Sequence, residues 1–385
     1  MQAVFWISLF VLFYTYVGYG LLLFVINAIK KRKHHIDEAF FPPITLVVPA
    51  YNEEGIIQEK IGNSLKLDYP DGQLHFIFVT DGSTDRTLEI VQQYPQIKVM
   101  HSGQRRGKTA AINRAMKEVE TPFVVMTDAN ALLDLQSLKK MVRHFSDEQI
   151  GGVSGEKRIA KNDSIVGFGE RLYWQYESML KKANANFFTL VGAAGELFAI
   201  RTRLFEPVDE KMILDDFVIS AKICQKGYRF LYESEAYAVE NASASISAER
   251  KRKIRISAGC FQALASMKSL LNPFKNPVLS FQYFSHRVLR WAVCPVLLPV
   301  SLFANIYLFL SGAGTIYSLF FWMQVVCYLL AFLGWLVPMK KALAKPLLVP
   351  SYFLFMVLSQ YAGFYRFVTK KQTVLWEKLR REPLR

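Results

Sequence analysis

Three short clusters of carboxylate and amide side chains are the residues of this chain best suited to chemistry. They are Tyr51-Asn-Glu-Glu54, Asp81-Gly-Ser-Thr-Asp85 and Asp128-Ala-Asn130. Together they suit a ribose, a base of the uracil type and a metal-bound diphosphate, because one acidic group can bind a ribose hydroxyl while another ligates a hard cation. Each cluster alone is also typical of a turn or a helix cap, since Asn and Asp begin both.

Asp215 and Asp216 form an adjacent acidic pair just before a helical pattern that runs from Phe217 to Gln225. Two neighbouring carboxylates can raise the pKa of one of them toward neutral pH, which makes the pair a candidate general base for a hydroxyl. The pair could instead cap the helix, and the two roles can coexist.

Other familiar site types are not indicated. The first turn carries neither G-x-G-x-x-G nor G-x-x-x-x-G-K-[ST], so no dinucleotide fold or P-loop is supported, and Gly107-Lys108 is too short a signal for a phosphate cradle by itself. The four cysteines have no close pairing and imply neither a disulfide nor zinc. The six histidines show no ligand spacing.

The elements that must position these residues alternate along the chain from Ile44. We expect strands at 44–49, 76–79, 97–100 and 123–127, with helices near 54–67, from Thr84 and from Lys108. Such alternation predicts an α/β domain with a parallel sheet covered on both faces. Ligands of such sheets bind at the carboxyl ends of the strands, so the three polar clusters are expected at one rim.

Long uncharged runs flank this domain. Residues 1–29, 291–339 and 346–365 carry no charge, and Ser311 to Thr315 supplies turn residues inside the second run. A bilayer requires about 20 apolar residues per helix, which predicts spans at 1–29, 291–310, 316–337 and 347–366. The basic stretch from Lys30 to Lys33 follows the first span, as in a retained helix rather than a cleaved signal peptide.

The expected division is a transmembrane helix at 1–29, a basic linker at 30–43, the α/β domain at 44–272, an interfacial helix at 273–290, a transmembrane region at 291–368 and a basic tail at 369–385. Basic residues beside a span mark the cytoplasmic side, so the domain is expected in the cytoplasm of a multi-pass protein of the cell (inner) membrane. Four crossings would then leave the basic tail outside. Either one C-terminal segment is re-entrant or the positive-inside tendency fails here, and we expect the tail to be cytoplasmic and amphipathic.

The formal net charge of +15 does not indicate a nucleic-acid partner. The basic residues lie mainly beside the spans and at 250–255, where anionic lipid head groups and a diphosphate explain them more economically.

The ordered set of motifs resembles the family-2 glycosyltransferases, in the broad group that contains cellulose and hyaluronan synthases. The similarity covers about residues 45–262. The motifs that carry it are Pro49-Ala-Tyr-Asn-Glu-Glu54, Thr80-Asp-Gly-Ser-Thr-Asp85, Gly107-Lys108 with Asn113, Thr127-Asp-Ala-Asn130, Gly192-Ala-Ala-Gly195 and Asp215-Asp-Phe-Val-Ile-Ser220. The resemblance implies a GT-A fold, which is a Rossmann-like nucleotide-sugar domain, here with one N-terminal and about three C-terminal transmembrane helices.

The resemblance also implies roles on the donor side, with a UDP-sugar as the expected donor. Glu53 and Asp81 would contact the nucleoside, and Asp128 would begin a D-x-D element that holds Mg²⁺ or Mn²⁺ on the diphosphate. Asn130 stands where a second acid is common, and its amide oxygen can still ligate a hard cation without adding charge. The remaining expected donor contacts are Pro49, Tyr51, Lys108, Arg252 and Arg255.

For the chemical step, the resemblance implies a single inverting displacement. Asp216 would be the base, with Asp215 as its neighbour in the cleft. The segment Gly192, Ala193, Ala194 and Gly195 would let the backbone approach the donor sugar or the acceptor, or would simply form a tight turn.

The segment from Arg250 to Arg255 departs from the Q-R-x-R-W pattern of processive relatives. Aligned on Gly259, Arg252 replaces Gln and Ile256 replaces Trp, so an aromatic platform for an acceptor sugar is missing there. We therefore expect transfer of single sugars to a membrane-associated, lipid-linked or short glycan acceptor, with a processive polysaccharide synthase as the alternative. The basic residues could also form a solvated or lipid-facing helix.

A function of another class is a nucleotide-sensing subunit of a membrane transporter. The absence of charged residues from the runs 1–29, 291–339 and 346–365 argues against an ion or proton pathway. An inactive scaffold is disfavoured because Asp81, Asp128 and Asp216 are all present.

Overall fold

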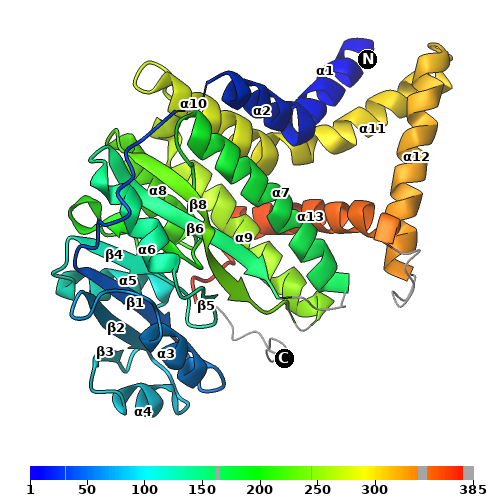
Figure 1. Ribbon diagram of the computed structural model, residues 1–385. Coiled ribbons are helices and arrows are strands. Elements are labelled where there is room, and N and C mark those ends of the chain that lie inside the picture. The colour runs from blue at the N-terminus through cyan, green and yellow to red at the C-terminus, as the bar shows by residue number, and fades with distance from the viewer. Residues whose placement is uncertain (31, 161–164, 244, 337–344, 376–385) are drawn as a thin grey trace.

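The computed structural model describes residues 1–30, 32–160, 165–243, 245–336 and 345–375. An α/β domain lies beside a group of long apolar helices (Figure 1). The domain is built on one eight-stranded sheet in the order β3-β2-β1-β4-β7-β6-β8-β5. Its strands are β1 Ile44–Ala50, β2 Leu74–Asp81, β3 Ile97–Ser102, β4 Phe123–Met126, β5 Leu132–Leu133, β6 Ile150–Ile159, β7 Phe198–Arg201 and β8 Arg229–Glu240.

The sheet is mixed, which corrects part of the sequence-based expectation. β1 pairs in parallel with β2 and β4, and β2 pairs in parallel with β3, as predicted for these four strands. β7 is antiparallel to both β4 and β6, and β5 is antiparallel to β8. The regular alternation of strands and helices, which predicts parallel pairing, ends at β4. Beyond β4 the direction in which a strand pairs depends on the tertiary path of the chain, as for β7, which follows the long helix α7.

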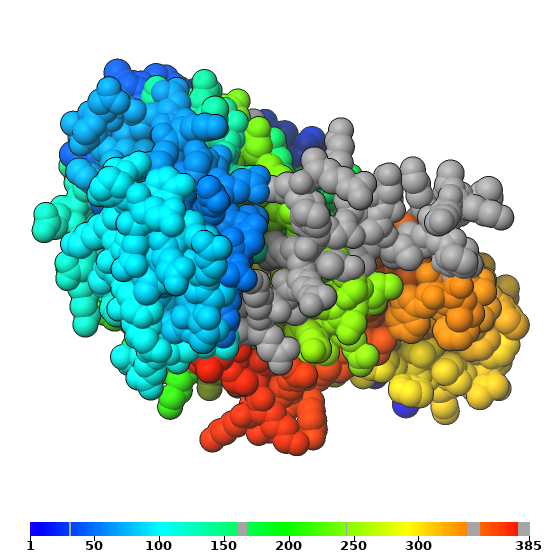
Figure 2. All heavy atoms as spheres, turned by 90° about the horizontal axis from the view of Figure 1, so that it is seen from below, coloured from blue at the N-terminus to red at the C-terminus, as the bar shows by residue number. Residues whose placement is uncertain are grey.

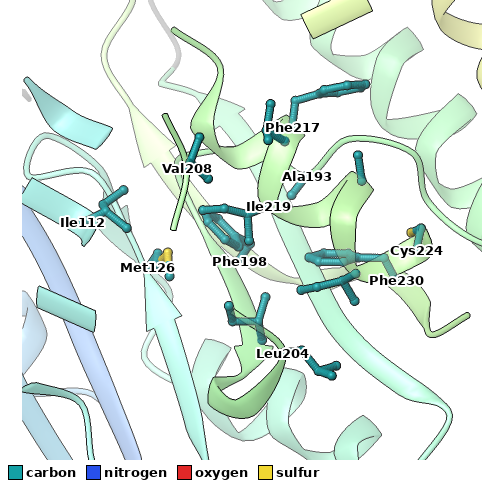
Figure 3. Packing of buried hydrophobic residues seen from close by; sticks show 14 of the residues in the cluster. Ile112, Met126, Ala193, Phe198, Leu204, Val208, Phe217, Ile219, Cys224 and Phe230 are labelled. Atoms are coloured by element: carbon teal, nitrogen blue, oxygen red, sulfur yellow. The ribbon is translucent and has the colours of Figure 1, made fainter. Parts of the chain in front are cut away.

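The domain helices cover both faces of the sheet. They are α3 Ile57–Leu65, α4 Thr87–Gln92, α5 Lys108–Ala115, α6 Ser137–Val142, α7 Ile165–Phe187, α8 Asp215–Gln225 and α9 Ile246–Ser266. In β1, Val47 belongs to one buried cluster, while Leu46 and Val48 belong to another on the opposite face. The first cluster includes Phe198 and Phe217 (Figure 3). Apolar packing on both faces fixes the sheet, so the ends of its strands can hold polar groups in place.

Among the described residues, four helices are long and apolar enough to cross a membrane, at Gln2–Ile29, Pro277–Leu310, Thr315–Leu336 and Leu347–Val368. They confirm the expected arrangement of one N-terminal and three C-terminal apolar helices, although the second begins at Pro277 rather than near residue 291. The first is α1 Gln2–Phe13 and α2 Tyr19–Ile29 joined by a π-helical turn, and the second is α10 Pro277–Tyr283 joined to α11 Cys294–Leu310 in the same way. The last two are α12 Thr315–Leu336 and α13 Lys345–Val368.

The segment at 273–290, predicted as an interfacial helix, continues without a break into α11. His286, Arg287 and Arg290 are buried there rather than displayed on the surface. Glu177 on α7 pairs with Arg287 at 2.8 Å and with Arg290 at 2.6 Å. This part of the helix therefore attaches the apolar helices to the α/β domain.

α13 lies along α9 and reaches the foot of α12 (Figure 1). Gly363 allows the close approach, because a Cβ at this position would be 2.4 Å from the Cβ of Ser257. Beyond α13, the chain returns to the α/β domain, and Figure 2 shows these red residues against its cyan part. The predicted basic run at 378–381 lies outside the described residues.

Candidate active site

One cavity of about 1090 Å³ collects almost all of the predicted site residues. Those that line it are Pro49, Tyr51, Glu53, Lys108, Asp128, Asn130, Ala193, Ala194, Gly195, Asp215, Asp216, Arg252 and Arg255. Asp81 and Gly192 do not line it. The walls come from the ends of β1 and β4, the first turns of α5 and α8, and the helices α7, α9 and α13.

The loop after β4 carries Asp128 and Asn130 into the cavity. Asp128 Oδ1 is 2.5 Å from Lys108 Nζ, which comes from the first turn of α5. Lys60, fully buried on α3, holds the same loop from behind: its Nζ donates to Thr127 Oγ1 at 3.0 Å and to the carbonyl of Ala131. The loop is therefore fixed at both ends, with Asp128 between the two lysines.

Asp81 stands behind the cavity wall. Its Oδ2 accepts hydrogen bonds from the backbone nitrogens of Arg106 at 2.9 Å and Gly107 at 2.6 Å, and Arg114 lies 3.3 Å from its Oδ1. The carboxylate thus fixes the loop that leads into Lys108. Its predicted contact with the nucleoside stays a prediction.

The first two polar clusters are joined to each other. Asn52 Oδ1 accepts from the backbone nitrogen of Thr84 at 2.8 Å, and Asp85 Oδ2 accepts from that of Glu54 at 3.2 Å. Asp85 Oδ1 also accepts from the backbone nitrogen of Thr87 at 3.0 Å, so the capping role considered for these clusters applies to Asp85, whereas Asn52 links one cluster to the other. Tyr51 lines the cavity, and its ring is covered by the guanidinium of Arg105, 3.6 Å from the ring centre.

Asp215 and Asp216 lie in the first turn of α8, which begins two residues earlier than its sequence pattern indicates. Asp216 Oδ1 accepts from the backbone nitrogen of Phe217 at 2.8 Å. Burial and the charge of Asp215 raise the pKa of Asp216 to about 7, against the opposing effect of Lys108. Asp216 thus has the ionisation expected of a general base near neutral pH.

The sequence left two roles open for the segment from Gly192 to Gly195, a tight turn and a close approach of the backbone to the donor sugar or the acceptor. The structure fits the first role at Gly192 and the second at Gly195. Gly192 has φ +97°, and a Cβ there would be 2.6 Å from the Phe217 ring, so packing requires glycine. At Gly195 a Cβ would be 3.1 Å from Asp216 Oδ2 and 3.2 Å from Lys108 Nζ. The backbone at Gly195 therefore approaches the acid–base groups closely.

Glu196 and Glu240 are cavity residues that the sequence analysis missed. Together with Asp128, each offers one oxygen, and the three oxygens lie within 4.8 Å of one another. Fully buried Lys157 forms ion pairs with both glutamates. Glu196 directly follows the Gly192–Gly195 segment. Glu240 is the last residue of β8, and its place at the end of a strand is the signal by which the sequence could have indicated it as a site residue.

The basic residues of α9 are held differently from one another. Arg252 pairs with Glu170 at 2.7 Å and with Glu249 at 3.5 Å, and Lys253 lies 3.4 Å from Glu249. Arg255 Nη2 donates to the carbonyl of Val374 at 3.2 Å, and no ion pair is found for it among the described residues. Arg252 and Lys253 are therefore paired with glutamates inside the protein and do not form a basic helix face open to lipid.

Residues that follow α13 line one side of the cavity. They are Lys371, Gln372, Thr373 and Leu375, and Leu375 Cδ2 would be 3.8 Å from a Cβ at Gly107. The described part of the tail therefore lies against the α/β domain, and the side of the membrane on which it lies stays a prediction.

Comparison with known proteins identifies the α/β domain. Residues 45–208 match the model of the family described as glycosyl transferase family 2. This part of the chain is a family-2 glycosyltransferase domain. The domain contains every predicted donor-side residue from Pro49 to Asn130, whereas Asp215, Asp216 and the basic residues of α9 lie beyond the matched range.

Curated relatives of the glycosyltransferase domain are poly-beta-1,6-N-acetyl-D-glucosamine synthases. The protein of Staphylococcus aureus is 26% identical over 246 residues, which cover 61% of this chain and 58% of that protein. The protein of Staphylococcus epidermidis is 25% identical over 273 residues, covering 68% of this chain and 64% of that protein. The chain thus matches less than two thirds of the length of either relative.

A solved structure extends the likeness to the apolar helices. The mannosyltransferase PcManGT from Pyrobaculum calidifontis, in complex with GDP-Man and Mn²⁺, matches with a TM-score of 0.72 at 24% identity, over 96% of this chain and 99% of that chain. The match confirms the predicted fold, a GT-A glycosyltransferase domain joined to apolar helices.

Proposed function

We propose that this glycosyltransferase moves a sugar, with inversion, from a nucleotide-sugar to the hydroxyl of a membrane-associated acceptor. The observation that carries the proposal is the meeting of Asp216, Lys108 and Asp128 in one cavity. There, a carboxylate with a pKa near 7 faces the residues suited to a donor diphosphate.

On the donor side, Pro49, Tyr51 and Glu53 would hold the nucleoside, and Lys108 and Arg255 the diphosphate. The donor set fits a divalent cation, since Asp128 with Glu196 and Glu240 offers carboxylate oxygens close together, and Asn130 adds an amide oxygen at the same wall. Mg²⁺ or Mn²⁺ would stabilise the charge that develops on the leaving diphosphate. Mn²⁺ and GDP-Man are bound in the structure of PcManGT.

In the chemical step, Asp216 accepts the proton of the acceptor hydroxyl as its oxygen forms a bond to the anomeric carbon. The bond from that carbon to the diphosphate breaks, and the nucleoside diphosphate leaves with the electron pair. Lys108, close to both Gly195 and Asp128, lies where it can stabilise the negative charge on the leaving group.

We infer transfer of single sugars, to a lipid-linked or short glycan acceptor, rather than polymer synthesis. Ile256 lines the cavity at the position where processive relatives have Trp. The names of the staphylococcal relatives favour the alternative, a processive polysaccharide synthase. The length of the products separates the two functions.

We further propose three crossings of the cell membrane, with α13 lying in the membrane surface. Several α13 residues contact the domain or its attached helix, among them Tyr352, whose hydroxyl is 3.4 Å from Glu249, and Gln360, which donates to the carbonyl of Arg290. Leu358, Tyr361, Tyr365 and Val368 form an exposed stripe on α13. With three crossings the domain and the tail are both cytoplasmic, in agreement with their basic flanks.

The activity is tested with the purified chain in detergent, a panel of UDP- and GDP-sugars, Mn²⁺ and a crude lipid extract. We expect nucleotide release with one donor from wild type and at least a hundredfold slower release from Asp216→Asn. Equal release by the two proteins, or none with any donor, would refute the proposal. A ladder of long glycans would establish the polymerase instead.

The topology is tested with an epitope tag after residue 385 in sealed, right-side-out membrane vesicles. We expect protease to spare the tag until the vesicles are opened. Cleavage in intact vesicles would place the tail outside and make α13 a fourth crossing.

A further inference from the structure

The cavity has a second, apolar half that the donor does not explain. Its total volume of about 1090 Å³ is at the upper limit of about 300–1,000 Å³ typical for a site that holds one small ligand. The donor-side residues occupy the end at β1 and β4. The opposite end is lined by α7 and α13, with Tyr16 and Trp291 from the first two apolar helices.

Two helical stripes form this half, which we call the α7–α13 groove. From α13 it is lined by Leu348, Val349, Tyr352, Phe353, Met356, Val357 and Gln360, and from α7 by Gly169, Leu172, Tyr173 and Tyr176. The spacing of three and four residues places each set on one helix face. The α13 stripe extends over thirteen residues, from Leu348 to Gln360, or about 18 Å along the helix axis.

The groove leads from the catalytic centre toward the membrane helices. At one end, Gln360 Nε2 donates to the carbonyl of Arg290, next to Trp291. At the other end, Ser351 on α13 donates to the carbonyl of Ala331 on α12 at 2.8 Å. Between them α7 and α13 approach each other closely at Gly169, where a Cβ would be 2.5 Å from the Tyr352 ring.

We propose that the α7–α13 groove binds the hydrocarbon chain of a lipid-linked saccharide, whose sugar hydroxyl is the acceptor at Asp216. This inference rests on the proposed function. Leu172, Val349, Met356 and Val357 offer no side-chain hydrogen bonds. The polar atoms of Tyr176, Tyr352 and Gln360 already donate to Tyr16, Glu249 and Arg290. A glycan here would therefore lose bonds to water with little replacement. A hydrocarbon chain loses none and gains apolar contact.

The presence of the base Asp216 indicates which head group the lipid acceptor carries. A phosphate oxygen is already anionic and can attack without losing a proton, whereas a sugar hydroxyl needs a base within reach. Asp216 lines the same cavity as the groove, and the ring of the next residue, Phe217, lies 5.3 Å from that of Trp291. A base so close to the groove favours a saccharide on the lipid over a bare lipid phosphate. The chain could be an isoprenoid or an acyl chain, and both have the apolar surface that the groove fits.

The test uses the full chain in lipid nanodiscs, the donor identified by nucleotide release, and a series of alkyl glucosides from methyl to hexadecyl below their micellar concentrations. We expect KM for the acceptor to fall about fourfold with each methylene that becomes buried, until the groove is filled. A KM independent of chain length would overturn the proposal. Polyprenyl-diphosphate saccharides and glycosyl diacylglycerols, assayed in parallel, distinguish the two kinds of chain.

A matched pair of variants locates the effect on α13. Met356→Trp fills the groove, whereas Leu358→Trp adds the same side chain on the exposed face, where Leu358 is 45% exposed. We expect Met356→Trp to reduce the preference for hexadecyl over methyl glucoside at least tenfold, and Leu358→Trp to retain it. An equal preference in both variants would place the chain elsewhere.

Photolabelling of the wild-type protein gives a measurement that does not depend on a variant's folding. A glucoside with a diazirine at the end of its alkyl chain should label residues within 169–176 or 348–357. Labelling confined to other segments would contradict the proposal. If no donor releases nucleotide, the proposed function fails; if free oligosaccharides are extended without any chain-length effect, only this inference fails.

Discussion

Lys108 Nζ lies 2.5 Å from Asp128 Oδ1, so the carboxylate best placed for a divalent cation is already paired with a cation of the protein. Lys108 is also close to Asp216, since both flank Gly195. One ammonium group thus lies between the metal-binding and proton-accepting carboxylates. Donor binding is expected to draw Lys108 from Asp128 toward the diphosphate, which frees the carboxylate for the metal ion.

Lys108→Met tests this relationship. We expect kcat/KM for the donor to fall by about 10²–10³, as when one preorganised electrostatic contact to the reacting group is removed. The Mn²⁺ concentration at half-maximal activity should fall, because Lys108 no longer competes for Asp128. Asp128→Asn weakens the metal ligand instead of its competitor, and should raise the Mn²⁺ concentration at half-maximal activity. A higher Mn²⁺ requirement in Lys108→Met would contradict the competition.

The pH dependence of kcat/KM reports on Asp216. Only the ionised carboxylate accepts a proton, and its pKa is raised to about 7, so activity should be lost as the pH falls below 7. Because Asp215 contributes to the raised pKa, Asp215→Asn should move this limb to lower pH. A limb that does not move in Asp215→Asn would mean that another group titrates.

Lys60 is expected to act as a positioning residue for the Asp128 loop. Lys60→Met keeps the side-chain length and removes the hydrogen bonds to Thr127 and Ala131. We expect kcat/KM to fall about tenfold, with a higher Mn²⁺ requirement. Ser64→Ala is the control, because Ser64 is equally buried on α3 and its hydroxyl donates to the carbonyl of Lys60, within the same helix.

Thermal unfolding separates this role of Lys60 from a purely structural one. Burial lowers the pKa of Lys60 to about 7, so the folded state binds its proton less tightly than the unfolded state does. Its contribution to stability therefore rises as the pH increases from about 7 toward the unfolded value. At pH 6, where Lys60 is charged in both states, Lys60→Met should not lower Tm. A large loss of Tm at pH 6 would indicate a general structural defect.

Glu177 and Arg287 should couple the second apolar helix to the catalytic loop. Arg287 pairs with Glu177, and its Nε donates to the carbonyl of Val191, just before Gly192. Removing Glu177 leaves Arg287 and Arg290 buried without their carboxylate, at a cost of about 3–5 kcal/mol, whereas removing Arg287 leaves Glu177 paired with Arg290 and should cost less. We expect both Arg287→Met and Glu177→Met to lower Tm, and the double variant to be more stable than the sum of the two losses predicts. Additive losses of unfolding free energy would show that the pair is not coupled.

Much of the donor side could be read from the sequence. Strand alternation and carboxylates at strand ends are local patterns, and the parallel strands β1, β2 and β4 necessarily end at one rim, which places Glu53 and Asp128 together. The apolar helices were equally predictable, because the length of an uncharged run sets whether a helix can cross a bilayer. Asp81 shows the limit of prediction from sequence, since its position behind the cavity wall depends on the loop that leads into α5.

The sequence by itself thus determined the class of chemistry and the number of apolar helices. Tertiary structure alone decided the antiparallel position of β7, the addition of Glu196 and Glu240 beside Asp128, and the groove between α7 and α13. These contacts join residues that are far apart in the chain, and a local pattern records the side chain of each but not its partner. The raised pKa of Asp216 has the same origin, because burial, its largest cause, exists only in the folded protein.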